Sequence, residues 1–376
     1  MEKIQIISIR EYFSEVETTR EYNGYFCSVG EALTIVILGS ICGFRNVSQI
    51  HQWASNPRVS LFLSNHFDIN NIPCYYWLLC LLKLINPSSL NDCFINWAQT
   101  FVPEKTSKLT ISFDGKTICS TGKMYKYISP LHVVSAQLCE LGLTLGQQTV
   151  SDKRNEIPAM RELLLLLDVE GCMIVADALH CQKETAKAVI SKKADYLLSV
   201  KDNQESLKQD ISDYVHDDIL RKTMDTITCT EKNRGRIEQR TAYVTSDISW
   251  LFGKDNWVGI SCIGAINTRC NTKKCKTDEW HYYISSSQLT AKELLLHARL
   301  EWSVETMHWL LDVHFDEDYC RIEDKNIQQN LNMIRKIALN SIKDYKNKTG
   351  SKLPMTKIML NCLLDCDNLG AILNLS

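Results

Sequence analysis

The chain has 376 residues, of which 45% are hydrophobic and 23% charged, and its formal net charge is −2. This length predicts two or three folding units, and the composition is ordinary for a soluble globular protein. The longest apolar stretches, Ala32–Phe44 and Cys74–Leu82, are too short to span a bilayer, and the N-terminus lacks the apolar core of a secretory signal, so we expect a cytoplasmic protein without a membrane partner.

The sixteen cysteines are scattered, and several lie in apolar runs, which favours buried thiols in a reducing compartment over disulfides. Cys270 and Cys275 form an isolated C-x₄-C without a second pair, which is a weak signal for zinc. The slightly negative net charge is evidence against a nucleic-acid-binding protein, because such proteins are usually basic overall. Basic side chains do cluster locally, for example Arg234, Arg236 and Arg240, although a solvated surface loop explains any one cluster equally well.

Residues 1–102 alternate apolar runs with polar breaks at helical spacing, and we interpret them as a small all-α N-terminal domain. The last of these helices follows Asn86-Pro87 and ends near Ala98, with Ser88 or Ser89 as its cap. The other expected helices are 29–43, 48–54 and 75–85. A polar segment that contains Pro103 then marks a boundary.

From residue 108 the pattern changes to short apolar strands and amphipathic helices. The expected strands are 109–113, 131–138, 143–150, 172–176 and 196–200, and the expected helices are 156–167, 182–191 and 204–215. Three strands followed by alternating helices and strands is the order of the ribonuclease H-like fold, an α/β fold with a mixed sheet. The first and fourth strands are neighbours in that fold.

The segment 222–288 differs from its surroundings, and we interpret it as a β-rich insertion. Its expected strands are 226–230, 237–244, 257–266 and 280–285, and the expected helices after it are 290–311, 326–345 and 357–369. The predicted division is therefore 1–102 for the helical N-terminal domain, 108–221 with 289–345 for the α/β domain, 222–288 for the insertion, and 346–376 for a helical tail.

Three acidic residues support a functional hypothesis. Asp114 follows the first expected strand and Asp177 the fourth, so neighbouring strand ends would bring the two carboxylates together. Glu305 lies on the helix after the insertion. Two strand-end carboxylates and one helical carboxylate are typical of a site for two Mg²⁺ ions, or Mn²⁺ in their place, in phosphodiester chemistry. Each acid alone is an ordinary turn or surface residue, so the prediction depends on their conjunction with the strand order.

The helix with Glu305 has a polar face and an apolar one. Glu301, Glu305, His308 and Asp312 share one face, where stacking Glu301 over Glu305 is unfavourable without a nearby cation. We interpret His308 as a structural histidine, because Mg²⁺ prefers oxygen ligands. The neighbouring stripe is expected to be core and consists of Trp302, Trp309 and Val313.

Candidate contacts to DNA phosphates are Lys201, Arg236 and Arg299. Their alternative role is ordinary surface pairing. The segment 314–318 is acidic but lacks the glycine and spacing of a calcium loop, which favours a charged helix end.

Longer strings resemble one family over nearly the whole chain. They include Asp-Gly-Lys-Thr (114–117), Asp-Ala-Leu-His-Cys-Gln (177–182) and Glu-Thr-Met-His-Trp-Leu-Leu-Asp (305–312). The chain resembles the H-repeat-associated insertion-sequence transposases of the DDE superfamily. The resemblance implies that Asp114, Asp177 and Glu305 are the catalytic metal ligands. It also implies Mg²⁺-dependent cleavage at element ends, strand transfer into double-stranded target DNA, and assembly of at least two subunits.

Some positions depart from the family pattern: Cys119, Ala176, Glu301 and Thr306 stand where arginine, threonine, histidine and asparagine are more common. None of these changes removes an expected metal ligand. Two alternatives stay open at this point. One is a structure-specific nuclease of the same fold, which would cut without joining. The other is a catalytically silent DNA-binding protein that descends from a transposase.

Overall fold

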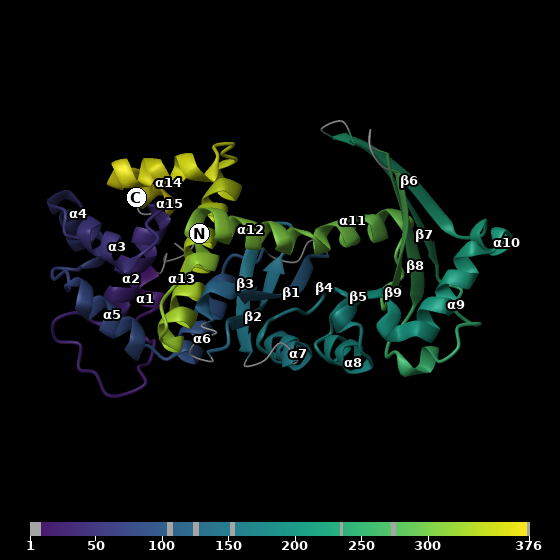
Figure 1. Cartoon of the computed structure of the whole chain (residues 1–376), viewed down its shortest axis with the longest axis horizontal. Coiled ribbons are helices and arrows are strands. Elements are labelled where there is room, and N and C mark those ends of the chain that lie inside the picture. The colour runs from purple at the N-terminus through teal and green to yellow at the C-terminus, as the bar shows by residue number, and fades with distance from the viewer. Residues whose placement is uncertain are drawn as a thin grey trace, which may run out of the picture.

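The computed structural model of the protein describes residues 9–103, 108–122, 128–150, 155–233, 236–271 and 276–373. A central sheet has helices on both faces, a helical unit lies at one end, and a tall group of strands lies at the other (Figure 1). None of the helices that the structure describes combines the length and the apolar character that a bilayer crossing needs.

The helical unit begins with short helices, several of which start at a side-chain cap. Its helices are α1 (Ile9–Tyr12), α2 (Val29–Ile41), α3 (Val47–Ala54), α4 (Pro57–Phe67), α5 (Tyr75–Leu84) and α6 (Pro87–Gln99). Ser28 and Glu31 form a capping box at α2. The prediction of Ser88 or Ser89 as the cap of α6 is wrong: the Asn86 side chain accepts a hydrogen bond from Ser88 N, and Pro87 occupies the first turn.

The described strands form one nine-stranded mixed sheet in the order β3-β2-β1-β4-β5-β9-β8-β7-β6. The strands of its first half are β1 (Thr110–Ile118), β2 (Leu131–Leu138), β3 (Leu143–Val150), β4 (Met173–Ala176) and β5 (Asp195–Val200). β1 pairs antiparallel with β2 and parallel with β4. The predicted strand order is therefore confirmed, including the neighbouring first and fourth strands.

β1 is longer than predicted, and this changes the position of Asp114. The expected strand ended at Phe113, whereas β1 continues to Ile118 because its second half pairs with β2. The parallel pairing with β4 does end at Phe113, opposite Ala176. Asp114 therefore lies within a strand, at the point where the β1–β4 pairing stops, and Asp177 follows β4 directly.

Two groups of helices cover the two faces of this half of the sheet. α7 (Glu156–Leu166) packs on β2 and β3, α8 (Lys183–Ser191) packs on β5, and α9 (Glu205–His216) with α10 (Asp218–Arg221) follows toward the tall strands. α11 (Ala291–Glu301) and α12 (Ser303–Phe315) lie in line across the opposite face (Figure 1). The single helix expected for 290–311 is thus two helices, separated at Trp302.

The β-rich segment extends the same sheet. Its strands are β6 (Asp225–Asn233), β7 (Arg236–Thr245), β8 (Cys262–Asn271) and β9 (Lys276–Ser285). β9 pairs antiparallel with β5, so the antiparallel group continues from the edge of the mixed half. The strand expected at 257–266 begins later, at Cys262, because residues 257–259 form a bend and a turn.

The C-terminal helices close the helical unit. They are α13 (Lys325–Thr349), α14 (Met355–Leu364) and α15 (Cys366–Ile372), and the expected helix 357–369 is divided at Asp365, which caps α15. α13 packs against α2, α5 and α6, and its apolar side chains share one core cluster with the N-terminal helices and with the buried face of α12. This core attaches α12 to the helical unit while α11 packs on the sheet.

Candidate active site

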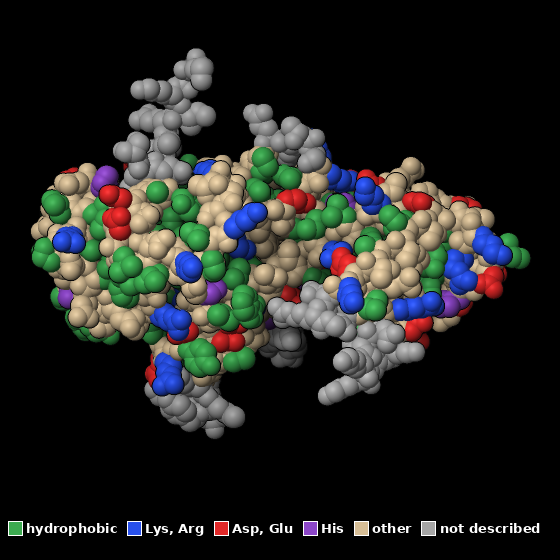
Figure 2. Space-filling model, turned by 90° about the horizontal axis from the view of Figure 1, so that it is seen from above, with side chains coloured by type: hydrophobic (Ala, Val, Ile, Leu, Met, Phe, Trp, Pro, Cys, Tyr) green, Lys and Arg blue, Asp and Glu red, His purple; other side chains and the backbone are tan. Residues whose placement is uncertain are grey.

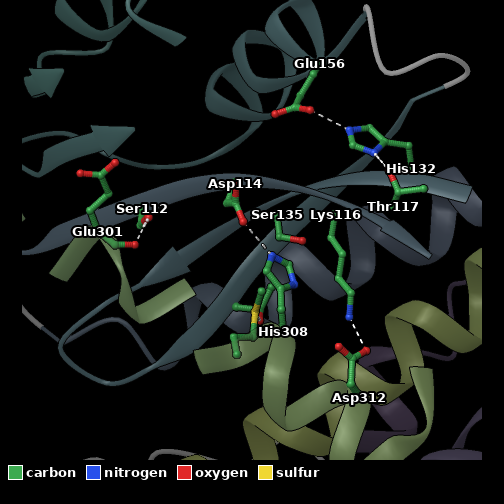
Figure 3. Close-up of polar contacts among 12 residues, drawn as sticks. Ser112, Asp114, Lys116, Thr117, His132, Ser135, Glu156, Glu301, His308 and Asp312 are labelled. Atoms are coloured by element: carbon green, nitrogen blue, oxygen red, sulfur yellow. Dashed lines mark hydrogen bonds and ion pairs between the residues drawn. The ribbon is translucent and has the colours of Figure 1, made fainter. Parts of the chain in front are cut away.

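One face of β1 is joined to α11 and α12 by side chains that alternate along the strand. Ser112 Oγ donates a hydrogen bond of 3.1 Å to the backbone oxygen of Glu301, at the end of α11. Two residues later, Asp114 Oδ2 lies 3.2 Å from His308 Nε2 of α12 (Figure 3). Because alternate residues of a strand point to the same face, these contacts place Asp114 beneath the junction of the two helices. This contact is an ion pair only when His308 is protonated, and neither ring nitrogen makes a hydrogen bond among the described residues, so the structural role of His308 stays a prediction.

The next residue on the same face, Lys116, is bound to the far end of α12. Its ammonium group contacts Asp312 and lies 2.9 Å from Glu317 Oε2, and Glu317 also accepts a hydrogen bond of 2.7 Å from Asn332. The expected charged helix end at 314–318 is therefore only partly solvated, since Glu317 is buried as the partner of Lys116. These ion pairs fix α12 along β1.

Asp177 lies beside Asp114 at the end of the parallel strand pair. Its carboxylate caps a short 3-10 turn, η4 (Ala178–His180), by accepting a hydrogen bond of 3.1 Å from Leu179 N. Asp177 is exposed, as is Glu305 in the first turn of α12. Both carboxylates are therefore accessible from solvent.

Glu301, at the end of α11, is the acidic residue of this region whose pKa is clearly raised. Burial raises its pKa to about 7, and the nearby charges of Asp177, Asp114 and Glu305 add to the shift, while Lys201 opposes it. The Glu301 carboxyl group therefore interacts electrostatically with all three predicted ligands. Sequence reasoning placed Glu301 on the face of Glu305, but did not expect it to be the more buried of the two. The break at Trp302, which separates them, leaves no signal in the helical periodicity.

The donor chemistry of this region fits a divalent cation, because four carboxylates supply the oxygen ligands that Mg²⁺ prefers and their mutual repulsion favours a positive ion. Among the residues that the structure describes, no three histidine, cysteine, aspartate or glutamate side chains converge closely enough to hold a metal ion as they stand. Asp114, Asp177, Glu301 and Glu305 are the residues that could hold one.

The predicted DNA-binding residues lie in different surroundings. Lys201 is exposed and close enough to Glu301 to affect its pKa. Arg299 forms an ion pair with Glu231, with Nη2 3.3 Å from Oε2. The side chain of Arg236 lies outside the described residues. On the face shown in Figure 2, basic and acidic side chains are interspersed among neutral ones.

The apolar stripe of α12 was predicted to be core, and this prediction is wrong. Trp302 is 64% exposed, Trp309 57% and Val313 43%. The buried face of α12 instead consists of Val304, Met307, Leu311 and Phe315. A new helix starts after Trp302. Its buried residues are those that pack against the helical unit, and they do not continue the apolar stripe expected for one long helix.

The cysteines that the structure describes are free thiols, as expected from their positions in apolar runs. Cys270 is buried in β8, and Cys275, the other half of the C-x₄-C pair, lies outside the described residues.

Comparisons with known proteins agree with this architecture. The family described as "Transposase DDE domain" matches residues 105–341, and the region described as "DDE_Tnp_1-associated" matches residues 10–98. "Putative transposase YncI" of Escherichia coli O157:H7 is 31% identical over 381 residues, which cover 98% of this chain and 97% of that protein. "H repeat-associated putative transposase YhhI" of Escherichia coli strain K12 is 31% identical over 312 residues, 80% of this chain and 82% of that protein.

A solved structure supports the fold. The piggyBac transposase in a synaptic complex with hairpin DNA, determined by cryo-electron microscopy, superimposes with a TM-score of 0.50 at 10% sequence identity and covers 97% of this chain and 78% of that one. The predicted ribonuclease H-like fold is confirmed. The extent of the family match and the relatives of nearly equal length show that this chain belongs to the DDE transposase family, among the insertion-sequence transposases that include the H-repeat-associated proteins.

Proposed function

We propose that this transposase cleaves DNA at the ends of an insertion sequence and joins those ends to target DNA, with Asp114, Asp177 and Glu305 as ligands of two divalent cations. The observation that supports the proposal is the position of the two aspartates, which follow the last paired residues of the parallel strands β1 and β4. Glu301 supports it as well, because its pKa is raised first by burial and then further by the nearby charges of all three residues.

The chain's own residues would hold and orient the reacting groups. Asp114 lies 3.2 Å from His308 of α12, and Asp177 is held by the 3-10 turn that it caps. Glu305 would approach from the first turn of α12, whose position along β1 is fixed by the ion pairs of Lys116. Bound Mg²⁺ would supply activation of the attacking hydroxyl and neutralisation of the leaving oxygen in an in-line displacement.

The DNA partner and the assembly follow from the same proposal. Lys201 lies next to the carboxylates and would contact a phosphate there, and Arg236 and Arg299 would contact the backbone farther along the duplex. Arg299 would exchange its ion pair with Glu231 for the phosphate. We propose a homodimer on paired element ends, acting in the cytoplasm, with Mn²⁺ able to replace Mg²⁺.

The four-part division of the chain is also a proposal. Residues 108–221 with 289–345 would form the catalytic domain, 222–288 the β-rich insertion, 1–102 the helical N-terminal domain, and 346–376 the C-terminal tail. The core that α12 and α13 share with the N-terminal helices indicates that the helical unit supports the catalytic domain.

The test is a strand-transfer assay on labelled DNA that carries the element's own ends, with Mg²⁺, with Mn²⁺ and with a chelator. Joined products with wild type and either metal, and none with Asp177→Asn, would support the proposal. Metal-dependent cutting without joining would favour a nuclease of the same fold. Binding of the ends without cutting would show a catalytically silent relative.

A further inference from the structure

A buried charged group lies on the face of β1 opposite Asp114. Glu156, the first residue of α7, is only 5% exposed, and its Oε2 lies 2.8 Å from His132 Nε2 of β2. On its other side, Oε1 lies 3.3 Å from His180 Nε2. His132 is fixed in turn by Thr117 of β1, whose Oγ1 lies 2.8 Å from His132 Nδ1 (Figure 3). A carboxylate with two buried imidazoles thus joins β1, β2, α7 and the turn after β4.

The charge of Glu156 is well stabilised despite burial. Burial alone would raise its pKa, but the contacts with His132 and His180 outweigh that effect and lower the pKa to about 2. The position at the first turn of α7 also favours a negative charge, since the N-terminal amides of a helix attract anions. The side chain is therefore a fixed anion at neutral pH.

This carboxylate contacts the residue next to Asp114 and the last residue of the turn that follows Asp177. A Cβ atom at Gly115 would lie 2.4 Å from the Glu156 carboxyl carbon, so the absence of a side chain beside Asp114 lets the carboxylate approach the strand. His180 ends the 3-10 turn that begins directly after Asp177. Glu156 therefore bridges the backbone next to Asp114 and the turn next to Asp177.

We propose that Glu156 is a positioning residue, which sets the distance between Asp114 and Asp177 by bridging Gly115 to His180. The inference rests on the proposed function for its catalytic consequence, but the bridge itself concerns this chain alone. Metal ligands need such support, because a small misplacement of ligands weakens both metal binding and rate. Residues that the turn contacts elsewhere, such as Asn203, whose Nδ2 donates 2.6 Å to Ala178 O, do not reach β1 in these contacts.

The experiment compares wild type with Glu156→Gln, which preserves shape and removes the charge, and with Gly115→Ala, whose methyl group would displace the carboxylate. The control is Glu162→Gln on the exposed side of the same helix, where Glu162 accepts a 3.1 Å hydrogen bond from Gln148. Thermal melting confirms that each variant folds. Amide hydrogen exchange of residues 178–181 is the first readout, because His180 N and Cys181 N donate within that turn.

We expect exchange in this turn to become about 10-fold faster in both site variants and to stay unchanged in the control. We also expect the cleavage rate to fall about 10- to 100-fold, with a higher Mg²⁺ concentration at half-maximal rate and an unchanged Kd for DNA. A purely structural role would lower the folded fraction without moving the Mg²⁺ dependence.

Two results would overturn the inference: exchange in 178–181 as slow as in wild type, or a faster turn with wild-type cleavage and Mg²⁺ dependence. If wild type itself cuts no DNA, the proposed function fails. The exchange data then still decide whether Glu156 fixes the turn.

Discussion

The two faces of β1 differ in burial and in what their charges can reach. Toward α11 and α12, Asp114 is about one-third exposed and close to the exposed carboxylates of Asp177 and Glu305. Toward α7, Glu156 is sealed between two buried histidines. Two carboxylates, one from β1 and one from α7, thus have different surroundings on the two faces of one strand. The carboxylate proposed to bind metal is accessible from solvent, whereas the carboxylate proposed to support the backbone is enclosed beside His132 and His180.

Removing the charge on the open face should have the largest functional effect. We expect Asp114→Asn to lower metal-dependent DNA cleavage by more than the roughly 100-fold typical of losing a supporting residue, because a proposed ligand itself is lost. Stability should change little, since the side chain is partly exposed. Gel-based cleavage rates and urea unfolding measure the two quantities. A variant that cuts at the wild-type rate would remove Asp114 from the site.

Removing the charge on the sealed face should instead have the largest effect on stability. We expect Glu156→Ala to lower the free energy of unfolding by about 3 kcal/mol, because two buried histidines lose their partner. The low pKa of Glu156, about 2, adds a pH signature: its stabilisation is present above the unfolded value of about 4.3 and is lost as the pH falls toward 2.

Urea unfolding at pH 6 and pH 3 tests this signature. The difference between wild type and the Glu156→Ala variant should shrink at pH 3, and Glu162→Ala should show no comparable difference at either pH. An equal difference at both pH values would show that packing and not charge explains the loss.

Glu301 combines features of both faces, because it is largely buried yet close to the carboxylates of the open face. Because the pKa of Glu301 is about 7, its ionisation lowers the free energy of unfolding. This loss is absent below pH 4 and complete above pH 7. Without metal, Glu301→Gln should raise the free energy of unfolding at pH 8 by on the order of 1–2 kcal/mol after solvent screening, with no gain at pH 4. Glu305→Gln at the exposed position is the matched control. A gain that is independent of pH would contradict this assignment.

The exposed tryptophans of α12 should have the smallest effect on stability. We expect Trp302→Ala and Trp309→Ala each to change the free energy of unfolding by less than about 0.5 kcal/mol, because both rings lie mostly in solvent. Trp309 lies on the helix with Glu305 and Trp302 directly precedes that helix. Exposed aromatic rings can stack on unpaired bases, so we expect weaker binding of frayed DNA ends. Fluorescence anisotropy measures the Kd, with Tyr76→Ala on the distant α5 as control. Unchanged affinity in both variants would exclude such stacking.

Much of the fold could be predicted from the sequence because its signals are local. The succession of strands along the chain and the extent of α7 follow from apolar runs and helical spacing, and the structure agrees with both. The neighbouring positions of Asp114 and Asp177 follow instead from the strand arrangement of the ribonuclease H-like fold, which that succession matches. The second half of β1 could not be predicted in this way, because it is held by pairing with β2 and contains polar residues such as Lys116.

The errors in the region of the site have one physical origin. The helical spacing of Trp302, Trp309 and Val313 is intact, but the chain breaks at Trp302 so that α11 can pack on the sheet and α12 on the helical unit. Such a break depends on packing against two separate cores, and the sequence of the helix alone carries no signal of that packing. The bridge at Glu156 was missed for a related reason: His132, Glu156 and His180 lie far apart along the chain, and only Gly115, beside Asp114, offered a local hint of a close approach.

The most direct test of the proposed site is iron-mediated cleavage of the protein chain. Fe²⁺ bound in place of Mg²⁺ generates radicals that cut the backbone near the metal, and mass spectrometry locates the cuts. We expect cuts near residues 114, 177 and 301–305 that disappear with excess Mg²⁺ and in Asp114→Asn. Cuts confined to other parts of the chain, or unchanged in that variant, would show that the open face of β1 is not where the metal binds.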